Sequence, residues 1–161
     1  DTPMTYDNPH VTGRALEVWD LESRSRLDSV ALPNDHVRDV VVSPSGNRLA
    51  VVSGSDVEEL SVWSLSGGAL ARIASVELTE IAGPVAFSRD DSLLAAGAPG
   101  GGVMVWDAAS GRRLGRLPGQ GEKVTELAFV QGADQLVVVT EEGAVELYRH
   151  DRTGRKAERK R

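Results

Sequence analysis

Three pairs of adjacent carboxylates are the residues of this sequence with the clearest capacity for chemistry: Glu58-Glu59, Asp90-Asp91 and Glu141-Glu142. Two carboxylates that converge on one atom act as general acid and base, and clustered carboxylates bind Ca²⁺. Neighbouring residues of a β-strand point to opposite faces, however, so an adjacent pair rarely converges on one substrate atom. We therefore interpret the three pairs as turn-forming and solubilising residues.

Two glycine-rich segments invite comparison with phosphate-binding loops. Residues 100–102 are a run of three glycines before an expected strand, with no Lys-Ser/Thr after them, and we interpret them as a tight turn between two inner strands. Residues 119–123 (Gly-Gln-Gly-Glu-Lys) faintly resemble a nucleotide loop. They also precede a strand, so no helix N-terminus is available for phosphate, and we expect a loop there.

The other reactive residue types are few. Cysteine is absent, which excludes disulfides, Cys-ligated zinc, Fe–S clusters and thiol catalysis. The three histidines, His10, His36 and His150, provide little for a metal site. His36 lies between Asp35 and Asp39 without a nucleophile placed beside it, so we interpret it as an exposed loop histidine. We predict no catalytic residue, no metal and no cofactor.

Length and composition are those of a globular chain. The 161 residues suffice for one domain or for a piece of a larger one, and 40% are apolar and 26% charged. No apolar run approaches the ~18 residues of a membrane span, and there is no signal-peptide pattern. Because the chain begins at Asp1, we expect a cleaved product or the end of a longer polypeptide.

The net charge of −6 is unevenly distributed. Residues 149–161 carry seven Arg/Lys against two acidic residues and sum to +5, which leaves −11 for the other 148 residues. So acidic a body is a poor surface for nucleic acid, and only this tail offers a basic segment. Arginine outnumbers lysine 15 to 3, which indicates a GC-rich bacterial genome, and we expect a bacterial cytoplasmic protein.

A repeat organises the whole chain. Four apolar-aromatic strings recur with their aromatic residues 44, 43 and 42 positions apart, in a chain that has only seven aromatic residues. Self-similarity at such a period is typical of repeat architectures. The strings are Val18-Trp19-Asp20, Val62-Trp63-Ser64, Val105-Trp106-Asp107 and Leu147-Tyr148-Arg149.

Other elements recur in phase with these aromatics. An apolar strand at 40–43, 85–88 or 127–130 is followed by a turn rich in Pro, Asp and Gly, and a second β-rich string then follows at 49–52, 93–96 or 136–139. After each Trp a polar turn leads to one more strand. Each period thus contains four strands of about five residues and no helix.

Four strands per repeat ending in Trp-Asp resemble the WD40-repeat family over residues 1–150. The best match runs from Val40 to Trp63, with Ser43-Pro44-Ser45-Gly46, Leu49-Ala50, Ser53-Gly54-Ser55-Asp56 and Val62-Trp63 in the family's order. The resemblance implies an all-β propeller of four-stranded antiparallel blades. An unrelated β-sandwich is the alternative, since it too alternates short strands with turns.

The repeats depart from the family pattern. The Gly-His dipeptide between blades is absent, so the buried Trp–Ser–His–Asp network that the family carries is incomplete. Ser53, Asp56 and Trp63 supply three of its parts in one blade, and Tyr148 replaces the last Trp. We expect the aromatics Trp19, Trp63, Trp106 and Tyr148, together with Ser53, to be structural, with packing holding the repeats more than that network.

The repeats predict about three to four blades. We assign 1–32 to the last strands of a first blade, 33–75 and 76–118 to two full blades, and 119–150 to three strands of a fourth. A closed propeller needs about 4–8 blades, so we expect a larger propeller, or a ring completed by another segment, another chain or a second copy.

The basic tail, 151–161, has three open interpretations. It starts the outermost strand of the last blade after a Thr153-Gly154 turn, as the likeness of Arg155-Lys156 to Arg112-Arg113 favours. It is otherwise a disordered basic arm or a solvated end.

The resemblance implies a non-catalytic platform that binds proteins or peptides through the loops of its top face. Those loops correspond to residues 33–37, 54–58, 98–101, 118–123 and 140–143. Their polar residues are Asn34, Asp35, His36, Asp56, Glu58, Gln120, Glu122, Lys123, Glu141 and Glu142. Because the body is acidic, we favour a protein or peptide partner with a basic segment.

Bacterial chains of this style resemble the sensor half of larger signalling or defence proteins. The alternative is a fragment of a propeller enzyme, such as a lactonase-like hydrolase or a quinoprotein. That alternative requires His, Asp or Arg to converge at the inner strand ends, which the sequence does not clearly provide.

Overall fold

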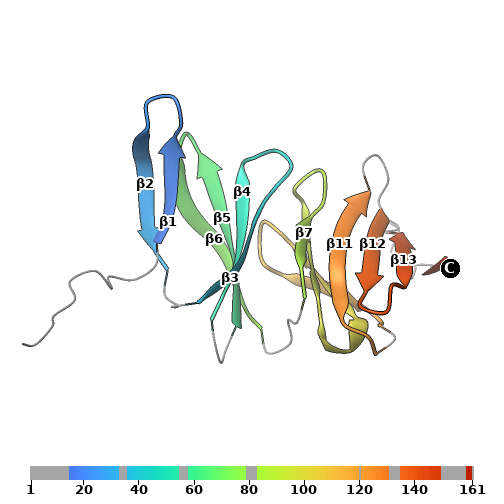
Figure 1. Ribbon diagram of the computed structural model, residues 1–161. Coiled ribbons are helices and arrows are strands. Elements are labelled where there is room, and N and C mark those ends of the chain that lie inside the picture. The colour runs from blue at the N-terminus through green and yellow to red at the C-terminus, as the bar shows by residue number, and fades with distance from the viewer. Residues whose placement is uncertain are drawn as a thin grey trace, which may run out of the picture.

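The computed structural model describes residues 15–32, 36–54, 58–78, 83–119, 121–130, 135–149 and 159–160. These ranges contain four separate antiparallel sheets, which stand in a row in chain order (Figure 1). The first sheet pairs β1 (Ala15–Asp20) with β2 (Ser25–Ala31). Each of the other three sheets has four strands, and within each sheet every strand is hydrogen-bonded to the strand that follows it in the chain.

The bounds of the remaining strands follow the repeat. The second sheet holds β3 (Val37–Val42), β4 (Arg48–Ser53), β5 (Glu58–Ser66) and β6 (Ala69–Leu78). The third holds β7 (Val85–Phe87), β8 (Leu93–Gly97), β9 (Val103–Asp107) and β10 (Arg113–Leu117). The fourth holds β11 (Val124–Val130), β12 (Gln135–Thr140), β13 (Val145–Arg149) and β14 (Arg159–Lys160).

This arrangement confirms the all-β expectation of four-stranded antiparallel blades, about three to four in number. The strands are short because turn residues interrupt each one. The connection from β5 to β6, for example, is only Gly67-Gly68, and both glycines have positive φ, +58° and +85°. Two consecutive positive φ values are what a two-residue hairpin of the favoured twist requires.

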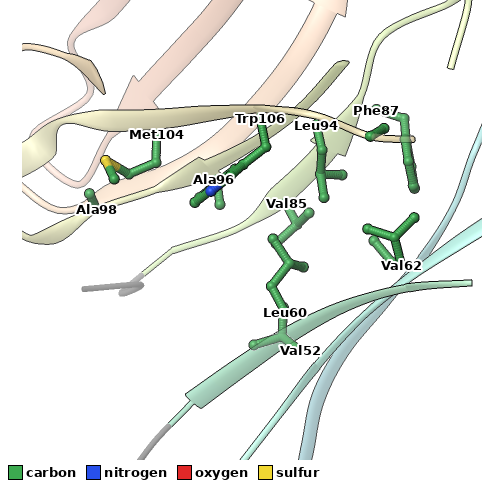
Figure 2. Packing of buried hydrophobic residues seen from close by; sticks show 12 residues of the cluster. Val52, Leu60, Val62, Val85, Phe87, Leu94, Ala96, Ala98, Met104 and Trp106 are labelled. Carbon is green, nitrogen blue, oxygen red and sulfur yellow. The ribbon is translucent and has the colours of Figure 1, made fainter. Parts of the chain in front are cut away.

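The core lies between the sheets rather than inside any one of them. Successive residues of β4 serve opposite interfaces: Ala50 and Val52 face the third sheet, and Val51 faces the first. Figure 2 shows the interface between the second and third sheets, where side chains of both sheets point toward one another. Those labelled there are Val52, Leu60, Val62, Val85, Phe87, Leu94, Ala96, Ala98, Met104 and Trp106.

The repeated aromatic packs against the sheet that precedes its own. Trp63 clusters with residues of the first sheet, Trp106 with residues of the second and Tyr148 with residues of the third. Each is at most 5% exposed, whereas Trp19, at the same position of the first sheet, is 51% exposed because no described sheet precedes it. Burial of this position therefore depends on the neighbouring sheet.

Hydrogen bonds fix the polar atoms of these aromatics. The indole Nε1 of Trp63 donates to the Ser61 hydroxyl at 2.9 Å. Ser61 lies two residues before the Trp, whereas the resemblance to the family points to Ser53 as the serine of this network. Ser53 itself is buried at the end of β4. The Tyr148 hydroxyl donates to the buried Glu146 carboxylate at 2.5 Å, and the carbonyl of Pro118 lies 2.9 Å from the same hydroxyl.

An arginine lies opposite each repeated aromatic on the next strand. Trp19 pairs with Arg26, Trp63 with Arg72, Trp106 with Arg113 and Tyr148 with Arg159. The guanidinium of Arg72 lies 6.0 Å from the centre of the Trp63 ring, within the range of a cation–π contact. The same register places β14 of the basic tail as the outermost strand of the fourth sheet. Residues 150–158, with the Thr153-Gly154 turn and Arg155, lie outside the described residues.

Candidate binding surface

Two kinds of loop lie on the same side of the row of sheets: the connections between sheets, and those between the second and third strands of a sheet. This follows from antiparallel strands paired in chain order, and hydrogen bonds between the loops show it directly. The amide of Gly121, between β10 and β11, donates to the carbonyl of Gly100, between β8 and β9, at 2.9 Å. The amide of Glu141 donates to the carbonyl of Lys123 at 2.9 Å. The predicted top-face loops of the third and fourth sheets therefore form one continuous surface.

The glycine run at 100–102 makes the close contact between two of these loops possible. Pro99–Gly101 forms a single 3₁₀ turn between β8 and β9, in which Gly100 and Gly101 both have positive φ. A Cβ on Gly119 of the neighbouring loop would collide with the backbone of Gly101 and Gly102. The glycines thus permit backbone-to-backbone packing, in agreement with the turn expected from the sequence.

Four of the predicted binding residues come together on the fourth sheet. The Thr140 hydroxyl donates to the Glu122 carboxylate at 2.6 Å, and the Lys123 amide lies 3.5 Å from the Glu141 carboxylate. Glu141 and Glu142 are exposed in the turn between β12 and β13. We call Glu122, Lys123, Glu141 and Glu142 the acidic hairpin; it holds three carboxylates and one ammonium.

The other predicted binding residues are not part of this group. His36 is exposed just before β3, and its carbonyl accepts a hydrogen bond from the Gly54 amide at 2.7 Å. It belongs to the second sheet, so the whole third sheet separates it from the acidic hairpin. Glu58 begins β5, but its side chain is outside the described residues. Asn34, Asp35, Asp56 and Gln120 also lie outside them.

Asp91 has a role that sequence reasoning missed. The sequence predicts that it serves solubility, but its carboxylate is buried. It joins two sheets on the side of the row opposite the acidic hairpin. The carboxylate accepts hydrogen bonds from the hydroxyls of Ser43, at 2.8 Å, and Ser45. The Arg48 guanidinium donates to the main-chain carbonyl of Asp91 at 3.0 Å. All three partners lie in or beside the turn between β3 and β4. The Ser43-Pro44-Ser45-Gly46 string, which the sequence marks as a turn, supplies two of these partners.

Its neighbour Asp90 stays within its own turn. Hydrogen bonds from the hydroxyls of Ser92 and Ser88, both 2.7 Å long, lower the pKa of Asp90 from its usual 3.8 to about 2. The two carboxylates of this pair thus face different partners, and they do not converge on a common site.

The lowered pKa of Asp90 predicts a defined acid sensitivity. A carboxyl whose pKa is depressed by folding stabilises the folded state above about pH 4, and this stabilisation is lost as the pH falls toward 2. Asp90→Asn should therefore lower the melting temperature by a constant amount from pH 7 to about pH 4, and the difference from the wild type should shrink below that. Thermal unfolding followed by circular dichroism tests this; a difference that persists unchanged at pH 2 would contradict it.

The described part of the chain contains no candidate metal site. Within it, no three His, Asp or Glu side chains lie close enough together to hold a metal ion. Glu59, of the first acidic pair, forms an ion pair with Arg72 on the adjacent strand. Among the described residues there is also no helix of the length and hydropathy needed to cross a membrane.

Four-stranded antiparallel sheets packed face to face in chain order are the blades of a β-propeller, and this chain forms part of one. No family model matches the sequence. The structure is similar to the β-propeller domain of Cps50 (Swd1) from Myceliophteria thermophila, with a TM-score of 0.73 and 14% identity over 85% of this chain and 48% of that one.

Two further solved structures share the fold. The WD40 repeats of RRP9 match with a TM-score of 0.61 and 20% identity over 76% of this chain and 38% of that one. The computationally designed Ika4 protein matches with a TM-score of 0.63 and 20% identity over 85% of this chain and 80% of that one. The chain thus spans less than half of the Cps50 and RRP9 propellers, and its fold is the WD40-type propeller fold that the sequence predicts.

Proposed function

We propose that this chain is a non-catalytic protein-interaction module whose acidic hairpin binds a basic segment of a partner protein. The observation that supports this is the acidic hairpin itself, in which Glu122, Glu141 and Glu142 stand on a loop surface tied together by backbone hydrogen bonds. Propellers of the WD40 type are typically rigid scaffolds that bind other proteins. The loops of a rigid platform are already ordered before the partner binds, and this lowers the entropic cost of association.

The charge distribution supports a basic partner. Outside residues 149–161 the chain sums to −11, so a basic segment is attracted over a distance before it makes contact. Such steering acts mainly on the association rate and weakens as salt is added, with a Debye length of about 8 Å at physiological ionic strength. The binding we propose is therefore fast and salt-sensitive.

The setting we propose is a larger bacterial signalling or defence protein in the cytoplasm, in which this propeller is the sensing or docking part. The arginine-rich composition supports the bacterial origin. The alternative, a fragment of a propeller enzyme, calls for polar residues converging at the inner strand ends. Among the described inner strands, β7 carries only apolar residues, while β3 carries Arg38 and Asp39 and β11 carries Glu126. β3 and β11 belong to sheets that are not neighbours, so these polar residues do not support a common catalytic site.

The double substitution Glu141→Lys/Glu142→Lys tests the proposed site. We expect it to weaken binding of an Arg/Lys-rich peptide about tenfold or more at low salt, mostly through a slower association rate, because close charge pairs at an interface are lost and replaced by repulsion. Surface plasmon resonance with the peptide immobilised measures both the rate and the affinity. Unchanged affinity and association rate would refute the proposal.

A matched pair of single variants separates the site from net charge alone. Glu142→Lys and Glu22→Lys change the charge equally, and both residues are exposed in turns. Glu22 lies in the turn between β1 and β2, on the side of the row opposite the acidic hairpin. Only Glu142→Lys should slow association; equal effects of the two variants would mean that net charge, and not this surface, attracts the peptide.

A further inference from the structure

The upstream end of the row exposes a side chain that the repeat is built to bury. Trp19 is 51% exposed, whereas its equivalents Trp63 and Trp106 are 4% and 2% exposed. It is held in a defined orientation all the same. Its indole Nε1 donates to Glu17 at 3.0 Å, and Arg26 donates to the same carboxylate at 2.9 Å. The first sheet thus presents an ordered aromatic on its outer face.

The downstream end exposes the other half of the same interface. Val145 of β13 is 65% exposed, while the residues at the same position of the second and third sheets, Leu60 and Val103, are 0% and 1% exposed. Val145 pairs with Val139. On the same face Leu147 pairs with Val137, so four apolar side chains line the outer face of β12 and β13.

This downstream face matches the surface that receives Trp106 inside the molecule. When the repeats are aligned on Trp63 and Tyr148, the pair Val145 and Leu147 corresponds to Leu60 and Val62. Leu60 and Val62 are among the residues of the second sheet that pack in one cluster with Trp106 of the third (Figure 2). One end of the chain therefore carries the aromatic and the other end carries its receiving surface.

We propose that two copies of this chain associate head to tail, so that Trp19 of each copy packs on the Val137, Val139, Val145 and Leu147 face of the other and a ring closes. A second copy is the occupant because one chain holds both complementary faces. The chain also spans 48% of the Cps50 propeller domain, so two copies supply about as much chain as that propeller contains. This association does not depend on what the acidic hairpin binds.

Light scattering after size exclusion tests the proposal on the 161-residue chain. We expect a mass twice the 17.2 kDa of one chain. Trp19→Glu and Val145→Glu should each weaken the association about 100-fold, because a charge replaces an apolar side chain that the partner would bury. Ile73→Glu, a matched change at an exposed apolar residue of β6 away from both ends, should leave the dimer intact.

Mixing the two variants distinguishes a specific head-to-tail contact from loss of folding. A mixed dimer of Trp19→Glu with Val145→Glu keeps one of its two junctions entirely wild-type, so an equimolar mixture should recover dimers that neither variant forms alone. A wild-type chain that stays monomeric at its highest soluble concentration, or that grows into open chains larger than a dimer, would overturn the proposal. Failure of the mixture to recover dimers would overturn it as well.

Cross-linking provides a second readout, because the chain contains no cysteine. A short bismaleimide should join Trp19→Cys to Val145→Cys in a mixture of the two variants, and it should not join either variant to itself. Cross-linking of Trp19→Cys to itself would show that like faces meet, which contradicts the head-to-tail arrangement.

Discussion

Trp106→Ala is expected to lower the free energy of unfolding by about 3–5 kcal/mol, because its side chain is the largest fully buried one between two of the described sheets. Trp106 is 2% exposed and packs in the cluster that joins the second and third sheets. Removing the indole takes apolar area out of that interface and leaves a cavity between two sheets, which cannot close without breaking the strand pairing on either side.

Urea unfolding followed by circular dichroism measures this loss. The matched control is Leu114→Ala, on the adjacent strand β10, where the side chain is 40% exposed and the expected cost is below about 1 kcal/mol. Because each sheet packs only on its neighbours, as in other repeat arrays, the Trp106 variant should also unfold less cooperatively. Equal losses for the two variants would show that the interface between the second and third sheets does not hold the molecule together.

Asp91→Ala is the second large effect, with an expected cost of about 2–4 kcal/mol. The buried carboxylate accepts hydrogen bonds from the Ser43 and Ser45 hydroxyls of the preceding sheet. Alanine leaves the buried Ser43 hydroxyl without its acceptor in a site shielded from water, whereas the exposed Ser45 hydroxyl can turn to solvent. Asp91 also has φ +58°, a conformation that aspartate and asparagine tolerate better than alanine.

Two comparisons isolate the cause of that loss. Asp91→Asn keeps the backbone preference and one acceptor oxygen, so it should cost less than Asp91→Ala in the same urea experiment. Asp107→Ala removes a carboxylate whose hydrogen bonds, from the Ser110 hydroxyl and from the Ser110 and Ala109 amides, stay within its own turn, and it should cost about 1 kcal/mol. If Asp107→Ala and Asp91→Ala cost the same, the contact between the two sheets contributes nothing beyond local turn stability.

The acidic hairpin was partly predictable from the sequence. The positions of its loops follow from counting strands between aromatics, and this count placed Glu122, Lys123, Glu141 and Glu142 at loop positions. That these four residues share one surface depends on the hydrogen bonds between Lys123, just before β11, and Glu141, in the turn after β12, which are 18 residues apart. No local pattern encodes that contact.

The repeat, the strands and the position of the aromatic in each repeat follow from the sequence, because turn residues and alternating apolar residues act locally and recur at a nearly constant spacing. The partners and the burial of equivalent residues depend on how the sheets pack together in the tertiary structure. Asp90 and Asp91 are neighbours of one type, yet one bonds within its turn and the other joins two sheets. Trp19 and Trp106 occupy the same place in their strands, but among the described sheets only Trp106 has one packed against it. Burial is supplied by the neighbouring sheet and not by the strand that carries the side chain.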